Sequence, residues 1–523
     1  MRTALRQKGR LPRGQVSGSV SYPAPIGGWN ARDAWAQMPP TDAIALENWM
    51  PRTSYLEGRG GFSSHATGMT GNGKTLATYN ALSGTNTLYC YTASGIYDVT
   101  SAGAVGASKL ARTNGKHQWV MFGDGTSNWL IAVNGVDKPA YYDGTTWTAV
   151  DGVSTPALTG LTTTKIIGVN AYQGRLFFIE KDTLSFWYLA SGAAGGALTE
   201  FPLDGECVMG GYLMAMATWT VDAGDGIDDR AVFVTSQGEV VVYAGTNPGS
   251  AAAWQKVGRY FIGKPIGRRC FCQYGGDVVL LTENGAFPLS AALQSATVDN
   301  KLALSFKVEN AFTDAARTYG TVFGWKPIIL QAQSALIVNV PLAEDGTHHQ
   351  YVMNTITKAW TKFVGWDAED FGILNSTLYF CDGTAVYKAW TGAADNNADI
   401  TFYGRTAFSY FGSRGSLKRV TGYRPILSAN GPLSYLTGID ADFADETLSG
   451  SAAVAGFSSG LWGTAIWGTS VWGSSGGIVS KDWTSPAVYP GYAFSAKMRI
   501  STKTITVQWM AGDYAYETGG VMG

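Results

Sequence analysis

The chain has 523 residues, enough for several domains, and its formal net charge of −1 excludes a global electrostatic field as the means of binding nucleic acid or a membrane surface. There are 67 glycines, 13% of the residues are aromatic, and only 15% are charged. Long helices need Glu, Lys, Arg and Ala, whereas short strands and tight turns need Gly, Asn, Thr and aromatic residues. The composition therefore predicts an all-β protein.

The N-terminal residues are basic and then rich in proline. Five cations precede the first acidic residue, Asp33: Arg2, Arg6, Lys8, Arg10 and Arg13. No apolar run follows them, so neither a signal peptide nor a membrane span is predicted. This basic segment has two interpretations, a solvated tail or a docking arm for an acidic partner or DNA phosphate.

Residues 1–74 as a whole predict an extended arm, since they contain several prolines and show no recurring pattern of β-hairpins. Within this arm, Asp42 to Met50 is expected to form one short helix capped by Asp42.

A short pattern recurs between residues 75 and 394: an apolar run, a tight turn, and a second short strand with an aromatic residue. The seven copies begin at Leu88, Leu130, Leu176, Val232, Val278, Leu336 and Leu378, at intervals of about 42 to about 58 residues. Each copy predicts a β-hairpin. The run Val278 to Leu281 has no polar alternation, so both of its faces are expected to be buried between neighbouring sheets.

Hairpins at this period are typical of a β-propeller with four strands in each blade. Tryptophans follow several hairpins, as Trp147 follows Tyr142 and Trp254 follows Tyr243, a spacing that resembles kelch-like blades. The sequence predicts a β-propeller of about seven blades over 75–394. The competing interpretation is a pair of β-sandwiches.

Residues 395–523 lack the recurring hairpin pattern but contain other strand-like runs, so they predict a separate C-terminal β-rich domain. It contains the segment LWGTAIWGTSVWG, in which Trp462, Trp467 and Trp472 stand five residues apart. Five is the period of neither a strand nor a helix. The rings are expected either to stack in a local core or to form an exposed aromatic patch for a partner protein, a sugar or a membrane interface.

Motifs for catalysis or cofactor binding are not found in a suitable context. Gly68 to Thr75 matches the pattern of a phosphate-binding loop, but no buried strand precedes it and a strand, not a helix, is expected to follow. The acidic residues Asp222, Asp225, Asp228 and Asp229 miss the spacing of a calcium loop. We therefore expect no enzyme activity, no metal and no cofactor.

The five cysteines are Cys90, Cys207, Cys270, Cys272 and Cys381. Their odd number and spacing predict neither a disulfide framework nor a zinc site. Assembly in a reducing compartment is expected.

The segment from Gly27 to Phe62 resembles the opening of the tail tube or nozzle proteins of short-tailed bacteriophages, also described as tubular tail or tail-hub proteins. The elements that carry the resemblance are GGWN with Asp33, MPP before Ala43 and Leu46, NW at Asn48, and RGGF from Arg59. The stretch LIAVNGVDKPAYYDGTTW from Leu130 resembles a blade of the same proteins. Together the two stretches cover about a tenth of the chain.

The resemblance implies a structural virion protein, assembled in the bacterial cytoplasm as a homo-hexamer below the portal and adaptor rings, whose channel conducts double-stranded DNA during genome ejection. It also implies that the propeller lies outward, while the N-terminal arm and the C-terminal region build a platform and tube wall. A low charge suits such a conduit, because phosphate contacts would slow the passage of DNA. Residues expected to dock to neighbouring rings, or else to pack within the arm, are Trp29, Arg32, Asp33, Asn48, Trp49 and Arg59.

Two other functions remain open from the sequence. One is a propeller that recognises a glycan or protein on the host cell envelope, and the other is a polysaccharide hydrolase with paired carboxylates at the propeller mouth.

Overall fold

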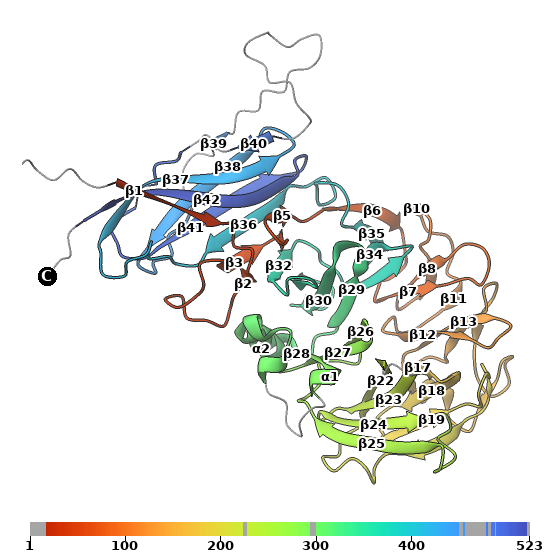
Figure 1. Ribbon diagram of the computed structural model, residues 1–523. Coiled ribbons are helices and arrows are strands. Elements are labelled where there is room, and N and C mark those ends of the chain that lie inside the picture. The colour runs from red at the N-terminus through yellow and green to blue at the C-terminus, as the bar shows by residue number, and fades with distance from the viewer. Residues whose placement is uncertain are drawn as a thin grey trace, which may run out of the picture.

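The computed structural model describes residues 17–222, 227–292, 300–448, 453–454, 477–479, 483–486 and 488–519. Most of the described elements are short β-strands, as the composition predicts. They form two modules, a ring of small antiparallel sheets and a sandwich of two larger sheets (Figure 1).

The ring contains seven small sheets that follow one another along the chain. The first two are β7 (Thr75–Tyr79), β8 (Thr87–Tyr91), β9 (Gly95–Asp98) and β11 (Leu110–Ala111), then β12 (Gln118–Gly123), β13 (Asn128–Val133), β14 (Ala140–Tyr142) and β15 (Trp147–Ala149). The third and fourth are β17 (Ile166–Tyr172), β18 (Arg175–Glu180), β19 (Ser185–Tyr188) and β21 (Thr199–Pro202), then β22 (Leu213–Asp222), β23 (Ile227–Thr235), β24 (Glu239–Gly245) and β25 (Trp254–Phe261). Before the third sheet lie the 3-10 helix η1 (Thr163–Lys165) and β16 (Leu158–Thr159), which pairs with β20 (Gly196–Ala197).

The last three sheets of the ring are less uniform. The fifth has three strands, β26 (Phe271–Tyr274), β27 (Asp277–Thr282) and β28 (Gly285–Pro288), followed by α1 (Leu289–Ala292), η2 (Asn300–Leu302), η3 (Phe306–Val308) and α2 (Glu309–Tyr319). The sixth has β29 (Lys326–Leu330), β30 (Ala335–Pro341), β31 (His348–Asn354) and β32 (Trp360–Val364), with η4 (Gln331–Gln333) in its first turn. The seventh has β33 (Asp370–Leu374), β34 (Thr377–Asp382), β35 (Ala385–Ala389), β6 (Phe62–Thr67) and β10 (Gly103–Ala104).

The seven predicted hairpins are all formed, as the antiparallel pairs β8–β9, β13–β14, β18–β19, β23–β24, β27–β28, β30–β31 and β34–β35. Val278 to Leu281 is buried on both faces, as its unbroken apolar run predicts. Large aromatic side chains also lie between neighbouring sheets. For example, Tyr89 of the first sheet packs against Trp147 of the second, and the centroids of their aromatic rings are 5.0 Å apart.

The ring is closed, because the first strand of each sheet contacts the neighbouring sheet and β33 of the last sheet contacts β7 of the first. In the last sheet β35 pairs antiparallel with β6, which comes from the N-terminal part of the chain, and β10 pairs with the other edge of β6. The arrangement is propeller-like, and a strand from near the beginning of the chain joins its two ends.

The sandwich is built from both ends of the chain. One sheet contains β4 (Trp49–Pro51), β5 (Leu56–Gly58), β42 (Val507–Thr518), β37 (Lys418–Ala429) and β40 (Gly477–Val479), and β1 (Ser17–Pro23) also pairs with β42. The other contains β3 (Asp42–Glu47), β36 (Ile400–Thr406), β41 (Phe494–Thr502), β38 (Ser434–Ala441) and β39 (Ala453–Val454), and β2 (Gly28–Trp29) pairs with β3. Apolar side chains from both sheets fill the space between them, including Trp49, Phe402 and Trp509.

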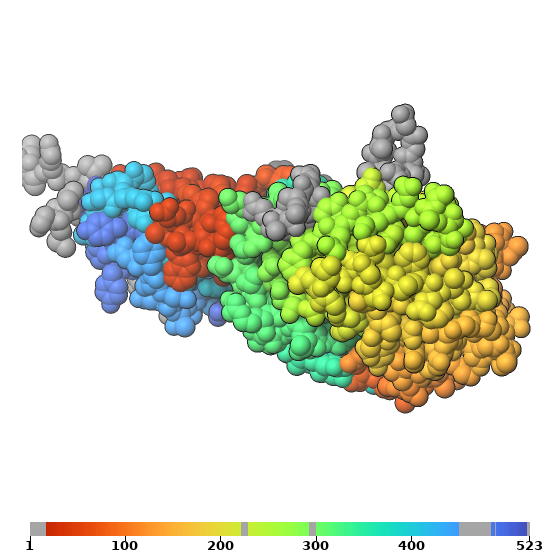
Figure 2. Space-filling view, turned by 90° about the horizontal axis from the view of Figure 1, so that it is seen from below, coloured from red at the N-terminus to blue at the C-terminus, as the bar shows by residue number. Residues whose placement is uncertain are grey.

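Strand β3 also pairs with β32 of the sixth ring sheet, so that one ten-stranded sheet runs from the ring into the sandwich. In Figure 2 the N-terminal residues (red) accordingly lie between the ring and the C-terminal strands (blue). Residues 17–58, expected to form an extended arm, thus supply five strands to the sandwich.

The helix expected over Asp42 to Met50 is not formed. Its residues belong to β3 and β4, with Asn48 between them in the left-handed region at a φ of 62°. The side chains of Ala43, Leu46 and Trp49 are buried between the sheets, and this burial with strand pairing to β36 outweighs a local preference for helix. Asp42, expected as a helix cap, instead forms an ion pair with Lys307 at 2.7 Å.

Candidate functional site

The segment that carries the resemblance, Gly27 to Phe62, lies where the ring meets the sandwich. Gly28 has a φ of 82°, and a Cβ atom there would stand 2.5 Å from the carbonyl oxygen of Trp360 in the ring. At Gly61 a Cβ atom would stand 1.9 Å from the carbonyl oxygen of Ala394. Only glycine permits these approaches of one backbone to another.

Arg59 is the centre of this junction, and its side chain is fully buried. Its guanidinium binds both carboxylate oxygens of Asp395, at 2.8 and 2.6 Å, and donates to the carbonyl oxygen of Val364 at 2.8 Å. Its Nε donates to Oδ1 of Asn48 at 2.8 Å, and the same oxygen accepts the Val364 amide. Asn48 in turn donates to the carbonyl oxygen of Thr401 at the start of the sandwich strand β36. One buried network therefore ties the arm, the ring and the sandwich together.

The six residues that the sequence predicts for docking to neighbouring rings differ in how far they are buried. Asn48, Trp49 and Arg59 are buried and have internal partners, so their side chains offer no surface to a neighbouring molecule. Trp29 is half-buried against Tyr351, with ring centroids 5.2 Å apart. Arg32 and Asp33 form an ion pair at 2.7 Å and remain about a third exposed.

A second cluster of charges lies at one end of the ring. Its members stand at or just before the starts of the first strands of five sheets: Lys74, Thr75, His117, Arg269, Lys326, Glu369 and Asp370. Arg269 reaches across, donating to Oγ1 of Thr75 at 2.6 Å and to the carbonyl oxygen of His117 at 3.0 Å, and it lies 3.2 Å from Asp370. Because the first strands surround the centre of the ring, this network fills one end of the central axis.

The carboxylates of this cluster are neutralised by cations. Lys326 binds Asp370 at 2.8 Å, and Lys74 binds Asp345 at 2.7 Å and Glu369 at 3.3 Å. Burial raises the pKa of Glu369, and the charge of Lys74 opposes that rise. The cluster is therefore a buried network of ion pairs that links the first strands of several ring sheets.

The phosphate-loop pattern ends in this cluster. Lys74 is used in ion pairs, and Thr75 begins the strand β7, so the helix that would face a phosphate is replaced by the expected strand. Of the acidic group Asp222, Asp225, Asp228 and Asp229, only the side chain of Asp229 is described, and it accepts a hydrogen bond from Thr220 at 2.8 Å.

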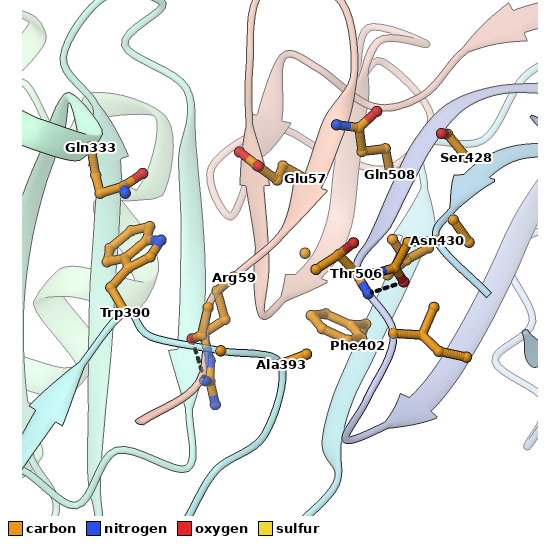
Figure 3. A pocket seen from close by; sticks show the side chains of 16 residues that line it. Glu57, Arg59, Gln333, Trp390, Ala393, Phe402, Ser428, Asn430, Thr506 and Gln508 are labelled. Carbon is orange, nitrogen blue, oxygen red and sulfur yellow. Dashed lines mark hydrogen bonds between the residues drawn. The ribbon is translucent and has the colours of Figure 1, made fainter. Parts of the chain in front are cut away.

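A cavity with a volume of about 420 Å³ lies between ring and sandwich (Figure 3). Gln333 and Trp390 line it on the ring side, and Phe402, Asn430 and Gln508 line it on the sandwich side. Glu57 and Arg59, from the N-terminal part of the chain, lie between the two sides. Sequence reasoning missed this site because its walls come from segments far apart in the chain; the only signal was Trp390 at the end of the last hairpin.

Trp462, Trp467 and Trp472 lie outside the described residues. Among the residues that are described, no group of three or more His, Cys, Asp or Glu side chains could hold a metal ion, and the five cysteines are free thiols. None of the described helices combines the length and apolarity needed to cross a membrane.

Comparison with known proteins gives distant likenesses in structure only. No family model matches the chain, and no curated protein matches it in sequence. The extracellular domain of a hybrid two-component system from B. thetaiotaomicron is 11% identical with a TM-score of 0.39, and the match spans 63% of this chain and 41% of that one. BBS1N in complex with ARL6DN is 12% identical with a TM-score of 0.40, over 65% of this chain and all of that one. YCF48 from Cyanidioschyzon merolae is 9% identical with a TM-score of 0.34, over 66% and 98% of the two chains.

Proposed function

We propose that this chain is a structural subunit of a short-tailed bacteriophage tail, part of a tail tube or nozzle that forms a hexamer below the portal and adaptor proteins and conducts double-stranded DNA. In this proposal the ring is a seven-bladed β-propeller, and the sandwich is the platform from which the tube is built. The chain would reside in the virion and act without catalysis.

The observation that carries the proposal is the position of the segment that resembles tail-nozzle proteins. Gly28, Asn48, Arg59 and Gly61 fix the junction between ring and sandwich, through close backbone contacts and one buried ion pair. The resemblance therefore falls on residues that determine architecture, which supports a shared arrangement of propeller and platform.

The closed axis of the ring bears on the path of the DNA. Arg269, Lys74 and Lys326 occupy one end of that axis with their acidic partners, so a duplex has no passage through a single ring. A conduit made from this chain must therefore be enclosed by several copies around a common symmetry axis.

The ring and the sandwich are joined by shared strands and hydrogen bonds, which suits a subunit of a tail that must withstand mechanical load. A ten-stranded sheet and the Arg59 network join ring and sandwich, so the subunit should move as one body under load. Docking to neighbouring rings would then use the partly exposed residues of the segment, chiefly Arg32 and Asp33, and not its buried part.

The proposal is tested by electron microscopy of the purified full-length chain at increasing protein concentration, together with mass measurement in solution. Closed six-fold rings with a central opening wide enough for duplex DNA support it. A chain that stays monomeric at every concentration, also with portal and adaptor proteins present, contradicts it.

A second candidate function, binding of an envelope glycan, is favoured by the cavity between ring and sandwich. Its lining combines an aromatic ring with several uncharged polar side chains.

A further inference from the structure

The cavity between ring and sandwich is lined by one tryptophan whose position is unusually fixed. Trp390 has a φ of 55°, in the left-handed region that bulky residues seldom adopt. Its ring is held edge-on by Phe363 and Trp366, with centroid distances of 5.4 and 5.7 Å. A residue held in such a conformation by its surroundings is a common feature of binding sites.

Trp390 stands at the boundary of two cavities. The larger, of about 420 Å³, falls within the size range of ligand pockets, about 300–1,000 Å³. A second cavity of about 230 Å³ shares Gln333 and Trp390 with the first, and its polar lining adds Ser376, Thr377, Lys388 and Thr391. The two cavities together offer space for a ligand with at least two units, and Trp390 lines both of them.

The charged groups of the larger cavity are already neutralised within the protein. Glu57 is bound by Arg52 at 2.7 Å, and Arg59 is bound by Asp395 at 2.6 Å. Burying a ligand charge here without a new partner would be costly. The cavity therefore favours an uncharged ligand.

The polar groups that remain are mostly carboxamides and hydroxyls. Oε1 of Gln333 accepts from Arg52 at 3.0 Å, and Oδ1 of Asn430 accepts from the Thr506 amide at 2.9 Å. Each of these side chains therefore has its NH₂ group left to donate. Gln508 and Ser428 line the same cavity without a side-chain hydrogen bond to any described residue, which adds both donors and acceptors.

We propose that this cavity binds a neutral oligosaccharide, with the C–H face of one sugar ring on the indole of Trp390 and hydroxyl groups on Gln333, Asn430 and Gln508. A sugar is the ligand class that requires a flat apolar face and many uncharged hydrogen-bonding groups at once. This proposal rests on the second candidate function, glycan binding, and names its ligand class. It does not depend on the conduit, since a hexamer that binds no sugar would leave the conduit intact.

The experiment is titration of the full-length chain with neutral gluco-, manno-, galacto- and N-acetylglucosamine oligosaccharides of two to four units, followed by calorimetry and saturation-transfer NMR. At least one series is expected to bind saturably, with one site per chain. Trp390→Ala should weaken that binding at least about tenfold, because a buried aromatic contact is lost. Gln508→Ala should weaken it several-fold while leaving the Trp390 contacts in place.

Trp483→Ala is the matched control, because Trp483 is exposed on the sandwich and does not line the cavity. Its binding should equal that of the unmodified chain. Trp390→Phe keeps a flat ring and should retain most of the affinity, which covers the case in which Trp390→Ala fails to fold.

Three results would overturn the inference. One is the absence of binding by every series at millimolar concentration, and another is binding that persists in both Trp390→Ala and Gln508→Ala. The third is a cavity filled by another copy of the chain, seen as loss of self-association in Gln508→Ala without any sugar binding.

Discussion

At the scale of single residues, the junction depends on one buried cation. Arg59 has five N–H donors, and they are directed to Asn48, Gly60, Val364 and the two oxygens of Asp395. Its side chain has no exposed surface, so no water can replace a missing partner.

Replacing Arg59 by methionine should therefore lower the free energy of unfolding by about 3–5 kcal/mol, because Asp395 is left as a mostly buried, unpaired charge. The measurement is equilibrium unfolding in urea. Arg317→Met is the control: Arg317 pairs with Asp314 on an exposed helix face, and its loss should cost less than about 1 kcal/mol. Equal effects of the two substitutions would show that the Arg59 network does not hold the junction.

The carboxyl group of Asp137 leads to a prediction of how the stability of the fold depends on pH. Burial opposes ionisation of this carboxyl, but hydrogen bonds from Thr113, Asn134 and Asn114 lower its pKa below the usual 3.8. A carboxyl with a depressed pKa in the folded state adds stability above its unfolded pKa, and this stability is lost as the pH falls through the folded pKa. Asp137→Asn should therefore be less stable than the unmodified chain at pH 7, with the difference shrinking as the pH falls below 4. Urea unfolding at several pH values measures this, and a difference that is constant with pH would refute it.

The sequence singled out three residues of the junction between ring and sandwich, but it did not show what they do. Asn48, Trp49 and Arg59 stood out as part of one segment, but whether they face a partner or the interior depends on contacts with distant residues. Arg59 and Asp395 are 336 positions apart in the chain, and local spacing carries no information about such a pair.

At the scale of elements, local order was predictable and long-range pairing was not. The seven hairpins were predicted because both strands of each are adjacent in sequence, with apolar runs and turn residues in between. The strand β6 was not predicted to complete the last sheet, because its partner β35 lies at the far end of the ring. The helix expected over Asp42 to Met50 was wrong for the same reason: strand partners supplied from distant segments override local preference.

Closure by β6 leads to a prediction for ring stability. Ala66 is fully buried in β6 and pairs with Val386. Ala66→Pro removes a backbone N–H donor from a strand that lies between two others. It should cost about 1–3 kcal/mol, because a buried acceptor is left without its hydrogen bond. Hydrogen exchange should accelerate in both the last sheet and the first, which contact each other.

The control for this change is Ser63→Ala, on the exposed side of the same strand, which should leave exchange unchanged. Faster exchange confined to β6 itself would mean that this strand does not hold the ring closed.

At the scale of the whole molecule, ring and sandwich should unfold together. The ten-stranded sheet passes from one to the other, and Trp49 and Leu46 of the arm lie in the sandwich core beside the junction. Scanning calorimetry of the full chain should show a single transition, because neither module keeps its edge strand when the other is lost. Two well-separated transitions would contradict this and would mean that the junction is weak.

The fused, closed subunit also defines the test of the proposed function. In the proposed conduit, DNA passes through a space enclosed by several copies and not through the axis of any one ring, where Arg269 and its partners lie. The most direct measurement is a three-dimensional reconstruction by electron microscopy of the assembled chain. We predict six copies around one open channel, with each propeller-like ring closed at its own centre. A monomeric particle, or a duplex threaded through the axis of a single ring, would show that the chain does not form such a conduit.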